Sequence, residues 1–156
     1  MILFKKTLLL VALSLAFMLT SCSLGNQTNA ATLVSSCSLD EISGGSHTPP
    51  TSYSVSLSTP DIILKGWLAN DLAGESPEQV TVVIADSLGK IHSFESGKSK
   101  IRPDVAEAYK KPGMKNSGFE ILMENVGKPG NYNLTIQGKF KKDNIICSRV
   151  YTLVVS

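Results

Sequence analysis

The sequence predicts an all-β fold, an antiparallel β-sandwich of about seven strands with one short helical turn. Several segments alternate apolar and polar residues with a period of two, as strands with one buried face do. Turn-forming residues separate these segments. Strands do not alternate with long helical patterns, which argues against a doubly wound α/β fold.

The alternation is clearest near the carboxyl end of the chain. Tyr132, Leu134, Ile136 and Phe140 are interleaved with Asn, Thr, Gln and Lys residues. Earlier in the chain, a turn signal at 86–89 separates two such segments, which predicts a hairpin. The strands expected in chain order are 53–57, 62–68, 80–84, 91–94, 119–123, 132–140 and 150–155.

One segment between these strands has helical features. Pro103 stands near a helix start, Asp104 falls in the first turn, and residues 105–109 include good helix formers. Residues 110–113 (Lys-Lys-Pro-Gly) then stop the pattern. One or two helical turns are therefore expected between sandwich strands.

The amino-terminal segment predicts export and attachment. Lys5 and Lys6 precede an uncharged run at 7–19, and small residues lead to Cys22, as in a secretory signal peptide. The run is shorter than the roughly 20 residues that a membrane span needs. Leu19-Thr20-Ser21-Cys22 resembles the lipobox of bacterial lipoproteins, which implies cleavage before Cys22 and lipidation of its thiol. The alternative is an ordinary signal peptide with a chance cysteine.

The chain is accordingly divided into a lipoprotein signal peptide (1–21), a lipidated flexible tether composed largely of Ser, Thr, Asn, Ala and Gly (22–36) and a globular domain (37–156). Acyl chains would attach the domain to a membrane without spanning it. The resemblance implies a bacterial cell envelope protein facing the periplasm or the exterior. The non-acidic Ser23 after the anchor resembles the outer-membrane-destined class, if the host has two membranes.

Charge argues against nucleic acid as a partner. The whole chain has 15 basic and 13 acidic residues, and loss of Lys5 and Lys6 leaves 13 of each. A neutral chain lacks the basic face that nucleic acid binding requires. The small basic group Lys139, Lys141 and Lys142 flanks an expected hairpin turn, and we interpret it as a solvated loop rather than a binding patch.

Two cysteines remain once Cys22 is lipidated. Cys37 and Cys147 form an even pair in a compartment that permits oxidation, which predicts a disulfide between them. Two buried free thiols are the alternative. His47 and His92 are isolated, and no metal-ligand spacing occurs, so neither a metal site nor another cofactor is expected.

A spaced set of residues resembles the Ig-like β-sandwich modules attached to bacterial cell-wall hydrolases and other surface proteins. The set includes Gly66-Trp67, the segment 102–106 (Arg-Pro-Asp-Val-Ala), Tyr109, Pro112-Gly113 and the segment 116–119 (Asn-Ser-Gly-Phe). The resemblance covers about residues 62–132. It implies an Ig-like fold and a surface setting, and it brings no catalytic residue.

The loop from Ser96 to Ser117 is the best candidate for a binding surface, because function concentrates on loops carried by rigid scaffolds. Its candidate residues are Arg102, Asp104, Tyr109 and Lys111. Arg102 and Asp104 are more simply interpreted as a clamp on the helical turn, and Tyr109 as packing it onto the sandwich edge. Trp67 is expected to fill the space between the sheets.

These observations favour a non-catalytic envelope lipoprotein that binds another envelope protein or acts as an accessory module. Binding of peptidoglycan or a surface glycan is the alternative, although no paired aromatic platform is evident. An enzyme is disfavoured because Gly-x-Ser-x-Gly is absent and neither histidine has a catalytic setting. Acidic pairs such as Glu75 and Glu78 are expected by chance among 13 carboxylates.

Overall fold

The computed structural model describes residues 31–48, 51–56, 61–96, 99–124 and 128–156. These residues form mainly strands, with one α-helix and one 3₁₀-helix, so the all-β class and the expected helical turn are confirmed. The described strands are β1 (Thr32–Val34), β2 (Cys37–Ile42), β3 (Gly45–Thr48), β4 (Ser52–Val55), β5 (Asp61–Leu68), β6 (Gln79–Asp86), β7 (Ile91–Glu95), β8 (Gly118–Glu124), β9 (Gly130–Lys139), β10 (Asn144–Cys147) and β11 (Tyr151–Val155). The helices are α2 (Pro103–Ala108) and η1 (Pro112–Asn116).

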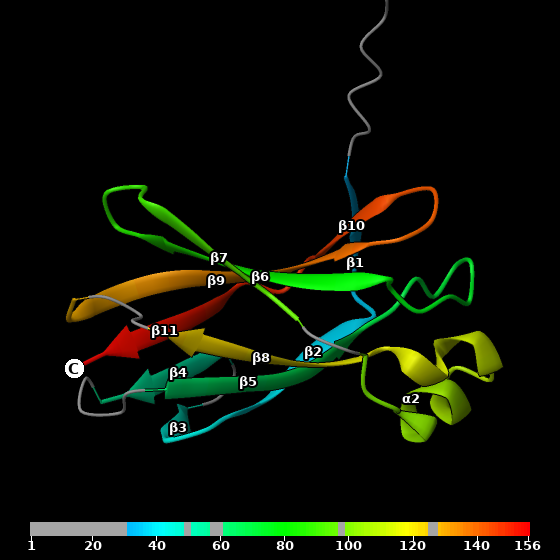
Figure 1. The fold of residues 1–156 in the computed structure, drawn as a ribbon, viewed down its shortest axis with the longest axis horizontal. Helices are drawn as coiled ribbons and strands as arrows, with labels where there is room; N and C mark the ends of the chain where they lie inside the picture. The colour runs from blue at the N-terminus through cyan, green and yellow to red at the C-terminus, as the bar shows by residue number, and fades with distance from the viewer. Residues whose placement is uncertain (1–30, 49–50, 57–60, 97–98, 125–127) are drawn as a thin grey trace, which may run out of the picture.

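The strands form two sheets (Figure 1). The large sheet is organised around β9, the strand with the clearest alternation in the sequence. One edge of β9 pairs with β6, and the other is shared by β10 and β11. β7 extends this sheet beyond β6, and β1, β4 and β3 complete it. The small sheet contains β2, β5 and β8 in the order β2-β5-β8.

The strand predictions require three corrections. The structure has more strands than the seven expected, because β1, β3 and β10 are too short to show a periodic pattern and no strand was predicted at β2. Two pairs, β1 with β10 and β11 with β4, are parallel, so the sheets are not purely antiparallel. β1 also lies inside the segment 22–36, so strand structure begins at Thr32 within the predicted tether.

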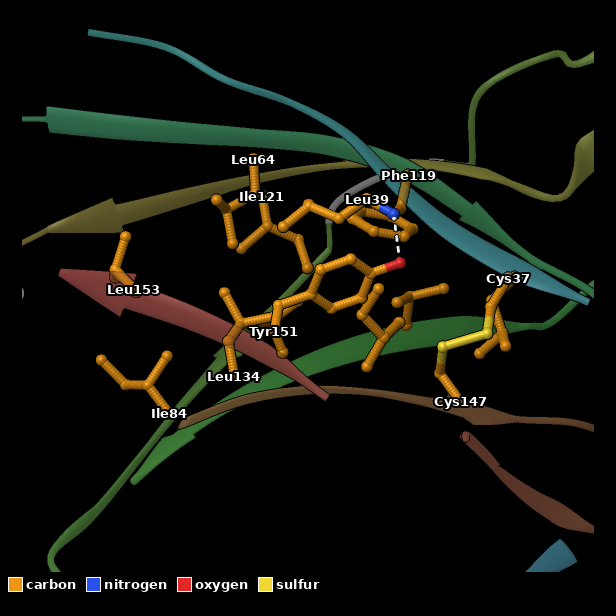
Figure 2. Close-up of a cluster of buried hydrophobic side chains, with 14 of the residues drawn as sticks. Cys37, Leu39, Leu64, Ile84, Phe119, Ile121, Leu134, Cys147, Tyr151 and Leu153 are labelled. Atoms are coloured by element: carbon orange, nitrogen blue, oxygen red, sulfur yellow. Dashed lines mark hydrogen bonds between the residues drawn. A yellow bond between two sulfur atoms is a disulfide. The ribbon is translucent and has the colours of Figure 1, made fainter. Parts of the chain in front are cut away.

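The main core lies between the two sheets (Figure 2). Leu64 and Ile121 of the small sheet point toward Leu134 and Leu153 of the large sheet, and all four side chains are fully buried. Each sits on the inward face of an alternating strand, which is why the period of two predicted these positions well. Burial of apolar surface at this interface is the main term that stabilises the fold.

A disulfide joins the two sheets at one end of this core, between Cys37 of β2 and Cys147 of β10 (Figure 2). The predicted pairing of these cysteines is therefore present in the structure. The two residues are 110 positions apart in the sequence. The bond links the first strand of the small sheet to a strand near the end of the chain.

Two tyrosines of the large sheet satisfy the backbone of β2 inside the core. The Leu39 N–H donates a hydrogen bond of 3.0 Å to the Tyr151 hydroxyl, which Figure 2 shows as a dashed line. The Tyr53 hydroxyl donates one of 2.7 Å to the Leu39 carbonyl. Burial raises the pKa of Tyr53, because the phenolate would lose solvation. These bonds link the two sheets at the point where the pairing of β2 with β5 is irregular.

The expectation that Trp67 lies between the sheets is wrong. β5 alternates, and Gly66 and Leu68 face the main core while Trp67 faces outward. A Cβ atom at Gly66 would lie 2.3 Å from the Ser38 carbonyl and 2.7 Å from the Phe119 ring, so glycine is needed there. The aromatic ring that fills this part of the core is thus Phe119, and Trp67 packs beneath the helices.

Candidate functional site

The two helices form a cap at the end of the small sheet where β5 ends and β8 begins (Figure 1). We define the cap as residues 102–116. Pro103 and Pro112 begin α2 and η1, as the fixed φ of proline favours. Lys110 separates the helices with φ of 54°, and it is the one non-glycine residue with positive φ in the described part of the chain. The cap lies within the loop region singled out from the sequence.

Arg102 holds the base of the cap through two carboxylates. Its Nε and Nη2 donate hydrogen bonds of 2.9 and 2.7 Å to Asp104, and Nη1 donates one of 2.6 Å to Asp40. The hydrogen bond from Arg102 lowers the pKa of Asp104, and the same contact raises the pKa of Arg102. The interpretation of Arg102 and Asp104 as a clamp on the helical turn is confirmed, and the Arg102 charge is already paired with two carboxylates within the protein.

Asp40 was not predicted as part of this cluster. Leu39 pairs with Gly66 and Glu41 pairs with Lys65, so Asp40 is the extra residue of a β-bulge in β2. Bulges redirect a side chain out of the regular alternation, and here the carboxylate meets Arg102 from a strand 62 residues away in sequence. No local sequence signal marks this bulge, because its position depends on the pairing of β2 with β5.

A small apolar cluster fixes the cap to the outer side of β5. Val105 and Met114 are buried together with Ala69, and Trp67 packs against them. The Trp67 and Tyr109 rings make an edge contact, with centroids 5.9 Å apart and planes at 66°. The expectation that Tyr109 packs the helical turn onto the sandwich is confirmed. The residue remains 37% exposed.

Polar contacts tie the other side of the cap to the loop 70–76. The Lys111 ammonium donates hydrogen bonds to the backbone carbonyls of Asp71 and Leu72. The Ser76 hydroxyl donates to the Gly113 carbonyl at 2.8 Å and accepts from the Asn116 N–H at 3.1 Å. Lys111 therefore serves as an internal clamp in this structure, although its position had suggested a role in binding.

An open groove of about 480 Å³ lies between α2 and η1. It is lined by the apolar residues Pro103, Ala106 and Pro112 and by the charged residues Glu107, Lys110 and Lys115. The two lysines are exposed, and neither forms an ion pair with another described residue. The groove combines apolar surface with two ammonium groups that are unpaired within the described part of the chain. Neither lysine was predicted as a site residue, because nothing in the local sequence distinguishes them from other solvent-exposed lysines.

The remaining predicted site residues are not brought to the cap. Cys22 lies outside the described residues, and Cys37 and Cys147 are bonded to each other across the sheets. His92 lies on β7 in the other sheet. Among the described residues, no group of three or more His, Cys, Asp or Glu side chains is arranged to hold a metal ion.

Comparison with known protein families, with curated proteins and with solved structures finds no match for this chain. None of the helices formed by the described residues has the length and apolar character needed to cross a bilayer. Interpretation of function therefore depends on the residues of this chain and their arrangement.

Proposed function

We propose that the protein is a lipid-anchored, non-catalytic lipoprotein of a bacterial envelope that binds another envelope protein through its cap. The observation that carries the proposal is the signal pattern at the amino terminus. Lys5 and Lys6, the apolar run 7–19 and Leu19-Thr20-Ser21-Cys22 together form the sequence expected before a lipidated cysteine. A disulfide between Cys37 and Cys147 is consistent with an oxidising compartment outside the cytoplasm.

We further propose that the all-β domain is an Ig-like β-sandwich. Two facing sheets with a disulfide between them support this assignment. The residues that carry the resemblance also have structural roles that suit a compact sandwich module. Gly66 accommodates the Phe119 ring, and Arg102, which also binds Asp104, fixes the helical segment to Asp40 of the sheet.

The cap suits a binding role because it is both rigid at its base and open at its surface. The Arg102 cluster, the Lys111 clamp and the apolar cluster under Val105 hold it in place. Its outer side presents the groove, which Lys110 and Lys115 help to line. This chemistry fits a partner segment that inserts a small apolar side chain next to a carboxylate.

Lipidation is tested by intact mass measurement of the protein isolated from membranes of an expressing bacterium. The expected product begins at Cys22 and carries a diacylglyceryl group, and Cys22→Ser abolishes both acylation and membrane retention. Full-length protein that keeps residues 1–21, or an unmodified soluble product, would contradict the anchor.

Binding through the cap is tested by placing a photo-crosslinking residue at Glu107 in the lipidated protein. A discrete protein adduct is expected in native membranes, and Lys110→Glu with Lys115→Glu should abolish it. Lys90→Glu with Lys128→Glu makes the same charge change on exposed residues outside the cap and should preserve the adduct. Retention on purified sacculi without any protein adduct would favour the glycan-binding alternative.

A further inference from the structure

We infer that the hairpin joining β9 and β10 lies on the membrane surface and that Lys139 and Lys142 bind the phosphate groups of anionic phospholipids there. The inference rests on the proposed anchor at Cys22 and adds an orientation of the domain to it. It concerns the basic group that the sequence suggested was merely a solvated loop.

Strand register places this hairpin beside the chain that leads to Cys22. β1 runs parallel to β10, with Thr32 opposite Ile145 and Leu33 opposite Ile146. β10 begins at Asn144, directly after the hairpin turn, and Asn144 pairs with Lys139. β1, the first strand among the described residues, therefore starts next to the hairpin, as Figure 1 shows for β1 and β10.

Chain length limits how far this end of the domain can lie from the lipid. Thr32 is ten positions after Cys22 in the sequence. Even a fully extended chain covers at most about 3.6 Å per residue, so the distance cannot exceed about 36 Å. β9 itself spans roughly 30 Å. The chain thus keeps Thr32 and the hairpin beside it within about 36 Å of the anchor, whereas the other end of β9 can lie roughly 30 Å farther away.

The charges at the hairpin suit an anionic surface. Lys139, Lys141 and Lys142 are all exposed, and Asp143 is the single acid within the turn and its flanking residues. None of the three ammonium groups forms a salt bridge with a described residue. Basic residues close to a bilayer are attracted by anionic headgroups within about a Debye length.

The three lysines are not equivalent. Lys141 lines a small depression together with Glu75 and Glu78, so nearby acids partly balance its charge. Lys139 instead lines a different depression, of about 300 Å³, where Ala31 leads into β1. We therefore assign phosphate binding to Lys139 and to Lys142, whose position at the tip leaves it free to reach the surface.

The depression beside Lys139 also offers neutral hydrogen-bond donors. Thr81, Gln137 and Asn144 line it along with Lys139. Hydroxyl and amide donors next to an ammonium group are a suitable set for phosphate oxygens. Leu33, on the adjacent strand, is 68% exposed and provides apolar surface on the same side. The cap lies at the same end of the domain, because Gly113 of the cap lines one depression together with Lys141, so a partner bound at the cap would also lie close to the membrane.

The test uses the full lipidated protein in vesicles of phosphatidylglycerol or of phosphatidylcholine. A single fluorophore is attached at Lys141→Cys or, as the matched position, at Asn131→Cys. Asn131 is exposed near the start of β9, at the opposite end from Lys139. The other cysteines do not compete, because Cys37 and Cys147 are bonded and Cys22 is acylated in the proposal. A lipid carrying a headgroup spin label quenches whichever fluorophore lies near the surface.

In phosphatidylglycerol vesicles we expect quenching at position 141 to exceed that at position 131 by about threefold or more. Lys139→Gln with Lys142→Gln should bring the ratio close to one, as should phosphatidylcholine. Lys90→Gln with Lys128→Gln, an equal charge change near the other end of β9, should preserve it.

Equal quenching at both positions in vesicle-bound protein would overturn the orientation while leaving the anchor intact. A ratio that persists in the Lys139→Gln and Lys142→Gln variant would overturn the role of these lysines. Protein that is not retained on vesicles at all would contradict the anchor itself, and the orientation with it.

Discussion

The main core and the cap use different means to hold their parts together. Side chains from both sheets meet in the main core, where eleven of the largest side chains, Phe119 and Leu134 among them, are essentially inaccessible to solvent. The cap rests on the buried residues Ala69, Val105 and Met114, with Trp67 beside them. Apolar burial dominates the first region, and polar contacts must contribute a larger share in the second.

The kinds of contact explain why the two regions should respond differently to damage. The main core is shared by strands distant in sequence and is cross-linked by a disulfide, so its loss unfolds the domain. The cap is a short continuous segment held by Arg102, Lys111 and Ser76 at its borders. Such a segment can open locally at a lower free energy than global unfolding.

The largest expected effect comes from removing the disulfide. Cys37→Ala with Cys147→Ala opens a loop of 110 residues in the unfolded chain, which costs roughly 4–5 kcal/mol in the chain-entropy estimate. The free energy of unfolding is measured by denaturant titration followed by circular dichroism. Wild-type protein under reducing conditions should reproduce the loss, and an unchanged midpoint in both experiments would show that the cross-link contributes nothing.

Removing apolar volume from the main core should rank second. Leu64→Ala empties a fully buried position on β5, and such substitutions cost about 2–5 kcal/mol. Leu122→Ala on the adjacent strand β8 is the control, because that side chain is 47% exposed. We expect the control to cost less than about 1 kcal/mol. Equal losses for the two variants would contradict the placement of the core between the sheets.

The sequence predicted the main core more completely than the remaining architecture. Long strands such as β6 and β9 carry alternation that identifies both the strand and its buried face. β1 and β3 have three and four residues, too few for a period, and their pairing depends on partners far along the chain. Parallel pairing of β11 with β4 likewise follows from topology rather than from a local signal.

The orientation of Trp67 shows a second limit of sequence reasoning. The prediction of a strand at 62–68 was correct, but its large aromatic residue was expected to occupy the core. Gly66 takes the inward position because the Phe119 ring requires the space above it. At the cap, a clamp formed by Arg102 and Asp104 could be proposed from their closeness in the sequence. The contact of Asp40 with Arg102 could not, because it depends on a β-bulge that only the pairing of β2 with β5 defines.

The cap should open without loss of the main core when its own buried methionine is removed. Met114→Ala creates a gap under the helices, and Met123→Ala makes the same change in the main core; both side chains are fully buried. We expect Met114→Ala to raise amide exchange at 103–116 by about tenfold or more, with little change in β6 and β9. Met123→Ala should lower protection throughout the domain.

Trp67 provides an optical check on this difference. It is the only tryptophan in the chain, and it lies against the cap. Exposure of Trp67 should shift its emission to longer wavelength in Met114→Ala before the circular dichroism signal changes in a denaturant titration. Coincident transitions in that variant would mean that the cap and the sheets unfold as one unit.

The smallest expected effect is a pH dependence of the cap. Hydrogen bonding from Arg102 lowers the pKa of Asp104 in the folded protein relative to the unfolded chain. Its contribution to stability is therefore complete above the pKa of the unfolded state, about 4, and is lost as the pH falls through the lower folded-state pKa. Because the Asp104 side chain is 61% exposed, the loss should stay below about 1 kcal/mol.

Asp104→Asn isolates this contribution. The variant should shift the Trp67 emission slightly at pH 6, and acidification from pH 5 to pH 2.5 should then change it less than in the wild-type protein. Glu107→Gln alters the same charge on an exposed residue of α2 and should retain the wild-type pH response. If Asp104→Asn kept the full change in Trp67 emission on acidification, protonation of another carboxylate would be what opens the cap. The Arg102–Asp104 pair would then be a consequence of cap closure rather than one of its causes.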